Sequence, residues 1–175
     1  MKRDGKNQGG FTLVELIIVI IILGILAALA IPQFATSTTD AKVATLKGNL
    51  AVFRNAINLY YHEHDSNYPG AKKIDGSGTA VAAADNPVAL INQLTQFTDK
   101  MGKTSVSKDA VNFPFGPYMT AIPENPLAVT GADADGFTVT SDVTRLTVDA
   151  APTTGWKYSH QTGQIIPNVA AHATL

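Results

Sequence analysis

The apolar residues of this chain are concentrated in one segment near the N-terminus. Residues 11–31 read FTLVELIIVIIILGILAALAI, in which Thr12 and Glu15 are the only polar side chains. A helix of this length spans roughly 30 Å, the thickness of the hydrocarbon core of a bilayer. The pattern therefore predicts a hydrophobic, membrane-embedded helix over residues 11–31.

A different apolar pattern follows Pro32. Apolar residues recur there at alternating spacings of three and four, which is typical of one stripe on an amphipathic helix. The stripe consists of Val43, Leu46, Leu50, Phe53, Ile57 and Tyr60. We expect residues 11–64 to form one long helical spine whose second half packs on a globular domain. A free coiled coil is the alternative, although the flanking charges typical of one are missing.

The rest of the chain, residues 65–175, predicts a small globular domain of the α+β class. A linker rich in Gly and Ala, from Lys72 to Asp85, precedes a short helix that Asp85 or Asn86 caps and that ends before Gly102. The expected buried stripe of this helix is Leu90, Leu94, Phe97 and Met101. The expected strands are Tyr118–Ile122, Phe137–Thr140, Val143–Val148 and Gly155–Ile166, the last with a hairpin turn at Thr162-Gly163. This order suggests a small antiparallel sheet packed on the stripe of the long helix.

Composition and charge narrow the possible partners. The chain has 175 residues, of which 45% are hydrophobic and 15% are charged, so one domain with a packed core is expected. The formal net charge is -1, which leaves no basic excess to neutralise a phosphate backbone, and no nucleic-acid partner is predicted. Cysteine is absent, which excludes disulfides and cysteine-ligated metal sites.

The polar segment before the hydrophobic helix carries a positive excess. Lys2, Arg3 and Lys6 outnumber Asp4 within residues 1–10. By the positive-inside rule, this end stays on the cytoplasmic side of a membrane. The remainder of the chain would then face outward as a mildly acidic, exported body.

Three ways of processing this N-terminus are compatible with the residues. The hydrophobic helix can remain as a permanent single-span anchor. A cut after Ala30, at the small-residue pattern Ala28-Leu29-Ala30, would instead release a secreted soluble domain. A cut after Gly10 would retain the helix and make Phe11 the first residue.

Glu15 favours the third route. A carboxylate within a spanning helix costs about 2.5 to 3.5 kcal/mol on insertion scales unless it has a partner. A cut after Gly10 would supply one, because the new α-amino group of Phe11 is mostly cationic at neutral pH and lies four residues earlier on the same helix face. The pair could form within one chain, and between neighbouring chains it could also set the axial offset of a packed helical bundle.

The residues around this site resemble a known family. Gly10-Phe11-Thr12-Leu13-Val14-Glu15-Leu16, with the apolar stretch that ends in Ala30-Ile31-Pro32-Gln33-Phe34, is similar to the class III leader and N-terminal helix of type IV pilins and type II secretion pseudopilins. The resemblance is close over residues 9–34. It implies a pilin-like fold and a structural subunit of a helical, homo-oligomeric filament, with no catalysed reaction and no cofactor.

The resemblance also implies roles for particular residues. Residues 1–10 would be a leader peptide that a prepilin peptidase/methyltransferase removes after Gly10 before it methylates the amino group of Phe11. Glu15 would recognise the amino terminus of a neighbour during assembly on an inner-membrane platform. The precursor would lie among the lipids of a bacterial inner membrane with its N-terminus in the cytoplasm, and the mature subunit in a cell-surface pilus or a periplasmic pseudopilus.

Two residues are expected to weaken the first half of the spine. Pro32 lacks an amide hydrogen and crowds the carbonyl of Ala28, so we expect the helix to kink or end there. Gly24 lowers the helix propensity by up to about 1 kcal/mol. In the resembled family this stretch unwinds when subunits enter the filament. An ordinary kink with a small-residue packing face at Gly24 and Ala28 is the other interpretation.

A second segment resembles the major pseudopilins of type II secretion systems. Gly116-Pro117-Tyr118, followed by Ile122-Pro123-Glu124-Asn125-Pro126, is similar to the GPY and P-x-D-P segment of those proteins. The chain departs from them in its tail, because residues 167–175 include no acidic side chain for a calcium loop. It departs from many pilins because it has no cysteine pair. A pilus subunit and a secretion pseudopilin are therefore both open.

The remaining polar clusters do not predict catalysis or a metal site. In His62-Glu63-His64-Asp65 the histidines are two residues apart, so they point in different directions on a helix. Asp133-Ala134-Asp135-Gly136 lacks the glutamate that would complete a calcium loop and is expected to be a polar turn. Asp75-Gly76-Ser77-Gly78 is also expected to be a turn, because no Lys-Ser or Lys-Thr pair follows it. We therefore predict no metal ligands and no enzyme.

Overall fold

The computed structural model describes residues 11–78 and 86–175, with the side chains of residues 29–36 and 86 left out. The chain forms two compact units, Met1–Ala41 and Lys42–Leu175. The expected leader, residues 1–10 with Gly10, lies outside the described residues. So does Asp85, one of the two expected caps of the short helix.

The long helical spine predicted from the sequence is confirmed. Helix α1 extends over Leu13–Glu63. It continues through residue 32, so the helix does not end at Pro32. The other form of that expectation, a kink, stays a prediction. A proline removes one backbone hydrogen bond of the ladder, and the bonds on both sides keep such a long helix intact. Weakening of the stretch between Gly24 and Pro32 stays a prediction.

Within the Lys42–Leu175 unit, α1 buries the apolar stripe that its sequence predicts. Leu46, Leu50, Phe53, Ile57 and Tyr60 are each at most 2% exposed. The ring of Phe53 packs edge-on against the rings of Phe137 and Trp156, with centroid distances of 5.6 and 4.9 Å. The chain therefore covers this stripe with its own domain, and the free coiled-coil alternative is wrong.

Helix α2, Asn86–Thr95, is shorter than the sequence predicts. Leu90 and Leu94 are buried as expected, whereas Met101 is 52% exposed. The chain leaves the helix because strand β1, Phe97–Thr98, pairs antiparallel with β2, Thr104–Ser105. The side chain of Asp99 stabilises the connection, since its Oδ1 accepts hydrogen bonds of 2.8 Å from the amides of Met101 and Lys103.

The main sheet has three strands in the order β3-β4-β5 and is mixed rather than antiparallel. Strand β3, Asp133–Thr140, pairs parallel with β4, Thr154–Ser159, and β4 pairs antiparallel with β5, Ile165–Pro167. The hairpin between β4 and β5 confirms the turn predicted at Thr162-Gly163. The strands expected at Tyr118–Ile122 and Val143–Val148 are wrong. Residues 141–153 instead form the crossover that a parallel pair requires.

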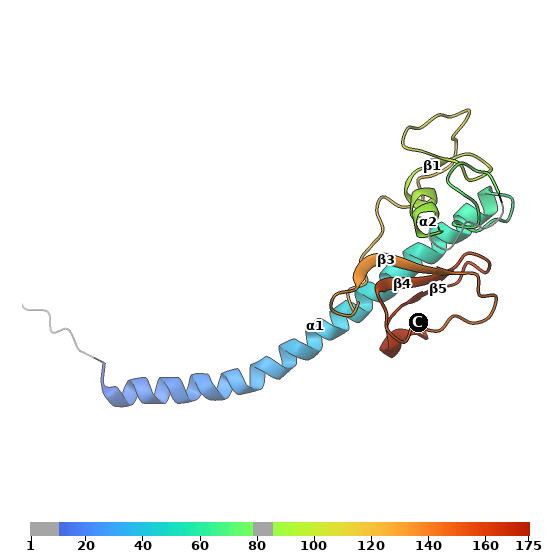
Figure 1. The fold of residues 1–175 in the computed structure, drawn as a ribbon. Helices are drawn as coiled ribbons and strands as arrows, with labels where there is room; N and C mark the ends of the chain where they lie inside the picture. The colour runs from blue at the N-terminus through green and yellow to red at the C-terminus, as the bar shows by residue number, and fades with distance from the viewer. Residues whose placement is uncertain (1–10, 79–85) are drawn as a thin grey trace, which may run out of the picture. The chain divides into compact units, whose positions relative to one another are not determined.

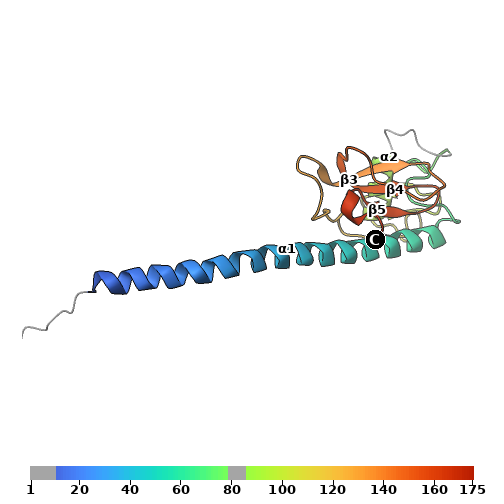
Figure 2. The same cartoon turned by 90° about the horizontal axis from the view of Figure 1, so that it is seen from below.

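Figures 1 and 2 show the three-stranded sheet lying alongside the C-terminal part of α1. The hydrophobic core lies between them, where Leu50 and Phe53 of the helix meet Trp156, Tyr158 and other inward-facing residues of the sheet. A short 3-10 helix, η1, follows over Ala170–His172. The α+β class predicted from the sequence is confirmed.

Candidate functional site

The first unit exposes a long row of large apolar side chains. From Phe11 to Leu26, those side chains have exposed fractions between 43% and 79%. They are Phe11, Leu13, Val14, Leu16, Ile17, Ile18, Val19, Ile20, Ile21, Ile22, Leu23, Ile25 and Leu26. An apolar surface of this extent marks an interaction site rather than an ordinary protein surface. No helix in the described part of the chain combines the length and the apolar character that crossing a membrane requires.

Thr12 and Glu15 form a capping box at the start of α1. The amide and the hydroxyl of Thr12 each donate to Oε2 of Glu15 at 2.8 Å, and the amide of Glu15 donates to Oγ1 of Thr12 at 3.3 Å. These reciprocal bonds satisfy backbone donors that a helix start would otherwise leave without partners. The sequence analysis missed this role of Thr12, although the spacing T-x-x-E before an apolar run is its known signal.

The capping box fixes the position of the Glu15 carboxylate and occupies one of its two oxygens. Its carboxylate lies at the very start of the helix, is exposed, and uses Oε2 for both bonds from Thr12. The partner expected from the sequence, the α-amino group of Phe11, forms only when residues 1–10 are removed. The geometry at Glu15 is therefore that of an anion at a helix N-terminus, a position that also favours negative charge electrostatically.

The cluster His62-Glu63-His64-Asp65 is split by the end of α1. His64 is 1% exposed, and its ring stacks on that of Tyr60 at a centroid distance of 3.7 Å. Its Nδ1 lies 2.8 Å from the carbonyl oxygen of Tyr60, so Nδ1 donates, and Nε2 then accepts from the hydroxyl of Thr98 at 3.0 Å. Burial lowers the pKa of His64, which keeps the ring neutral near neutral pH. His64 thus ties the helix end to β1.

The two acidic segments that the sequence predicts to be turns differ in the structure. Asp75-Gly76-Ser77-Gly78 is a turn as expected, in which the amide of Ser77 donates to Oδ1 of Asp75 at 2.8 Å. Asp133 and Asp135 instead begin β3, so the expected polar turn is wrong. The nearby Asp135 carboxylate raises the pKa of Asp133. Across the described residues there is no group of three or more side chains that could hold a metal ion.

The segment that resembles major pseudopilins fastens the domain to α1 and to the sheet. The hydroxyl of Tyr118 donates to Oε2 of Glu63 near the end of α1. The side-chain amide of Asn125 donates to the carbonyl of Gly155 at 2.7 Å, and the indole of Trp156 donates to the carbonyl of Pro123 at 2.9 Å. These buried or half-buried bonds give the segment a structural role in this chain.

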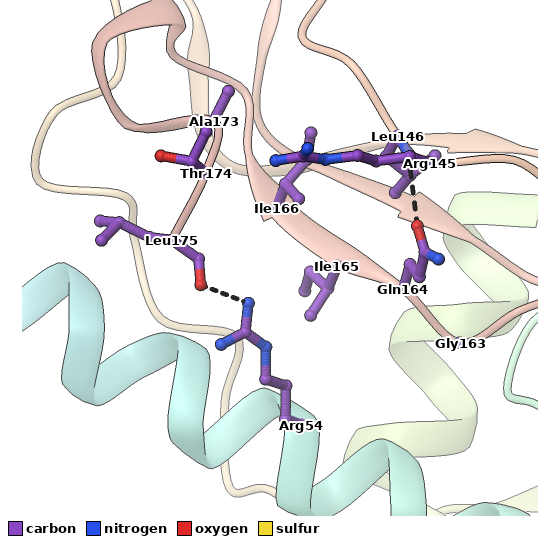
Figure 3. A pocket seen from close by; sticks show the side chains of 10 residues that line it. All are labelled: Arg54, Arg145, Leu146, Gly163, Gln164, Ile165, Ile166, Ala173, Thr174 and Leu175. Atoms are coloured by element: carbon purple, nitrogen blue, oxygen red, sulfur yellow. Dashed lines mark hydrogen bonds between the residues drawn. The ribbon is translucent and has the colours of Figure 1, made fainter.

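A hollow of about 310 Å³ lies where the C-terminal segment meets α1 (Figure 3). The guanidinium of Arg54 donates to the main-chain oxygen of Leu175 at 2.8 Å, and the amide of Leu146 donates to Oε1 of Gln164 at 3.3 Å. Arg145 and the buried Ile165 also line it. The described residues of this lining include no nucleophile paired with a base.

The N-terminal region of the chain matches a known family model. The family model described as "Prokaryotic N-terminal methylation motif" matches residues 5–31. These residues include the capping box and the whole exposed apolar row. No solved structure matches the chain significantly.

The chain is also similar to curated proteins of two kinds. It is 44% identical over 55 residues to "Type II secretion system core protein G" of Pseudomonas aeruginosa, which covers 31% of this chain and 39% of that protein. It is 32% identical over 120 residues to "Type IV major pilin protein PilA" of Myxococcus xanthus, covering 65% of this chain and 54% of that protein. It is 30% identical over 117 residues to a "Fimbrial protein" of Pseudomonas aeruginosa, covering 58% of this chain and 73% of that protein.

The fold and the similarity together define the class of protein. The structure has a long N-terminal helix with an exposed apolar start, followed by a small α+β domain. This is the pilin-like architecture that the sequence predicts. The chain belongs to the family of type IV pilins and type II secretion pseudopilins. The matched region spans about half or less of the first two relatives named above.

Proposed function

We propose that the chain is the precursor of a structural subunit of a type IV pilus-like filament and catalyses no reaction. The observation that supports this most is the exposed apolar row of α1. Full burial of one such side chain contributes roughly 1.5 to 3 kcal/mol relative to water, so the row is stable only against lipid or against other apolar surface. The same helix from neighbouring copies supplies that surface when contacts repeat in a helical, homo-oligomeric filament.

Before assembly, the hydrophobic helix would reside in a bacterial inner membrane. Its support is the sequence of residues 11–31, in which Glu15 is the one ionisable side chain and lies at the helix start. The basic excess of residues 1–10 would keep the N-terminus in the cytoplasm. Lipid and neighbouring subunits are then the two environments between which the helix moves.

Processing would occur after Gly10 by a prepilin peptidase/methyltransferase, followed by N-methylation of Phe11. The match of residues 5–31 to a family model named for N-terminal methylation supports this assignment. The mature subunit would then join the filament at an inner-membrane assembly platform.

Glu15 would set the register between subunits. Its carboxylate is exposed and already carries the two bonds from Thr12, so its second oxygen is available for another donor. Once the leader is removed, the α-amino group of Phe11 is a cation of suitable charge, in the same chain or in the next. Between chains, this pair would fix the axial offset of neighbouring helices.

The stretch between Gly24 and Pro32 would be the part of α1 that loosens on entry into the filament. At Gly24 no side chain contributes to packing, and a Cβ built there meets no atom within 4 Å. The missing amide hydrogen of Pro32 removes one bond of the ladder. If Gly24→Ala, which favours the helix, leaves assembly unchanged, loosening near Gly24 is not required.

Two variants separate the charge of Glu15 from its capping function. Glu15→Gln keeps an oxygen that can accept from Thr12 but removes the negative charge. Thr12→Ala removes the hydroxyl of the cap, with its two bonds to Glu15, but keeps the charge. We expect Glu15→Gln to insert into membranes normally and to reduce filament yield severely, and Thr12→Ala to assemble. A normal filament yield from Glu15→Gln, measured by electron microscopy of sheared surface material, would show that charge pairing is not required for assembly.

The second candidate function is that of a major pseudopilin in type II secretion. The segment Gly116–Pro126 and the similarity to core protein G favour it. Deletion of the gene for this chain distinguishes the pilus subunit from the secretion pseudopilin. Loss of surface fibres with normal protein export supports a pilus subunit, whereas loss of export with unchanged fibres supports the pseudopilin.

A further inference from the structure

The hollow of about 310 Å³ beside α1 brings together two arginines from distant parts of the chain (Figure 3). Arg54 belongs to α1, and Arg145 belongs to the crossover between β3 and β4. Strand β5, the turn before it and the C-terminal segment supply most of the remaining lining. Among the lining residues that the structure describes, none has an acidic side chain. We call this surface, at the β5 edge of the sheet, the cationic hollow.

Both guanidinium groups of the cationic hollow keep hydrogen-bond donors that the described part of the chain does not use. Arg54 donates to the main-chain oxygen of Leu175 at 2.8 Å, which uses one of its five N–H groups. The guanidinium of Arg145 makes no hydrogen bond and no ion pair within the described residues. Both side chains are exposed. An anion near both arginines would therefore find free donors and two attractive charges.

The opposite edge of the same sheet carries the complementary charge. The strand order is β3-β4-β5, so β3 and β5 are the two edge strands. Asp133 and Asp135, the acidic pair, are exposed near the start of β3 and line a hollow of about 450 Å³. The described residues of that hollow include no basic side chain. Because the carboxylate of Asp135 raises the pKa of Asp133, a cation placed against the pair would relieve a repulsion that already exists.

The position of the two charged surfaces fits contacts between copies of this chain. Contacts that repeat along a helical filament are heterologous, which means that one surface of each copy meets a different surface of the next copy. The cationic hollow and the acidic pair are two such surfaces on opposite edges of one sheet. Arginine can also form two parallel hydrogen bonds with a carboxylate, which orients the partner as well as attracting it.

We propose that the cationic hollow of one subunit binds the acidic pair of a neighbouring copy in the filament. This inference rests on the proposed function, in which the apolar row of α1 drives assembly, and it assigns a second contact to the globular domains. Complementary charges of this kind contribute mainly to specificity and orientation. The contact would therefore determine how neighbouring domains face each other, while the apolar row supplies most of the stability.

Charge reversal tests the contact in filaments sheared from producing cells. Arg145→Glu alone and Asp135→Lys alone should each lower the filament yield about tenfold or more, because each places like charges opposite one another. The double variant restores opposite charges and should recover most of the yield. A double variant that assembles no better than the single variants, or single variants that assemble normally, would overturn the pairing.

Two controls accompany the charge reversals. Lys108→Glu makes the same change of charge at an exposed lysine that lines neither hollow, and it should assemble normally. An equal loss of yield in Lys108→Glu would assign the effect to net charge and contradict the proposal. The unfolding midpoint in denaturant should be the same for all variants, since all the substituted side chains are exposed.

Cysteine cross-linking locates the contact directly, because the chain has no cysteine of its own. In filaments, Arg145→Cys combined with Asp135→Cys should give a ladder of disulfide-linked oligomers, whereas each single variant should stay monomeric. A disulfide within one chain is not expected, because two strand spacings of about 4.8 Å separate the edges of the sheet and exceed the Cα separation of about 7 Å that a disulfide allows. Lys108→Cys combined with Asp135→Cys is the matched control and should give no ladder.

The outcomes distinguish this inference from the proposed function. Filaments of the Arg145→Cys and Asp135→Cys double variant without a ladder would contradict the contact, although the chain would still be a filament subunit. Absence of filaments from the unsubstituted chain would contradict the proposed function itself. If the cysteine pair fails to assemble, the recovery of yield in the charge-reversed double variant decides the question.

Discussion

The two ends of α1 use the same kinds of apolar residue in opposite environments. Near its start, Ile18, Ile20 and Leu23 are about half exposed. Near its end, Leu50, Phe53 and Ile57 are at most 1% exposed. The first set has no cover within the described chain, whereas the second set forms the core of a domain.

The difference follows from how the apolar positions are distributed around the helix. The first part is apolar on every side, which is typical of a helix surrounded by lipid or by other helices. The second part confines its apolar residues to one stripe, which one sheet can cover. Hydrophobic residues thus form the core of a domain in one half of a single helix, whereas in the other half we propose that they drive assembly.

The largest effect is expected from a core substitution in the second half. Phe53→Ala should lower the free energy of unfolding by about 3 to 5 kcal/mol, because the ring fills a closed space against Phe137 and Trp156. Ile18→Ala should leave the unfolding of the globular domain unchanged. Trp156, the single tryptophan, is buried beside Phe53 and reports unfolding by its fluorescence in denaturant. Equal destabilisation by both variants would contradict the division of roles.

A smaller effect is expected at a buried amide that the sequence analysis missed. Gln93 is fully buried, and its side chain accepts from the amide of Gly70 at 2.7 Å and donates to the carbonyl of Gly102 at 2.9 Å. Gln93→Ala leaves these backbone groups without partners, at a cost of about 1 to 3 kcal/mol. Gln96→Ala, on a half-buried neighbour, is the matched control. Thermal unfolding of the two variants should differ clearly, and similar midpoints would show that water replaces the Gln93 bonds.

Loss of the capping box should have a modest, local effect. Thr12→Ala removes the two bonds of the Thr12 hydroxyl but keeps the bond from the backbone amide of residue 12 to Glu15, and should destabilise the start of α1 by about 0.5 to 2 kcal/mol. The globular domain should unfold as before. Amide hydrogen exchange measures this directly, and faster exchange limited to the first turns is the expected result. Faster exchange throughout the core would mean that the two halves of the helix fold as one unit.

The smallest effect is expected from acidification. Burial lowers the pKa of His64 in the folded chain, partly offset by the carbonyl of Tyr60 and the carboxylates of Glu63 and Asp99. The unfolded chain therefore binds more protons once the pH falls below the ordinary histidine pKa of about 6.5. Stability should decline from there until the pH reaches the lower folded pKa, below which His64 adds no further slope. The melting temperature of His64→Gln should depend less on pH in this range, and an unchanged slope would assign the effect to other groups.

The sequence predicts those parts of the fold that local periodicity determines. The spacing of Leu46, Leu50 and Phe53 identifies the buried face of α1 without knowledge of what covers it. The hairpin at Thr162-Gly163 is also local, since Gly163 adopts the positive φ of 69° that such a turn favours. Both predictions are confirmed because neighbouring residues carry the signal.

Pairings between distant segments are harder to predict. Val143–Val148 has the residue types of a strand, but β3 pairs directly with β4 and leaves that segment in the crossover. Nothing in the segment itself indicates that parallel pairing. At the candidate site, the sequence predicts Glu15 as an unusual charge but not its bonds with Thr12.

The most direct test of the central claim is the mass of the N-terminal peptide of the subunit in filaments sheared from producing cells. The claim is that the exposed apolar half of α1 is kept after processing and is buried among copies of itself. The account predicts a peptide that begins with N-methylated Phe11. A peptide that begins at Ile31, or one that retains residues 1–10, would contradict it.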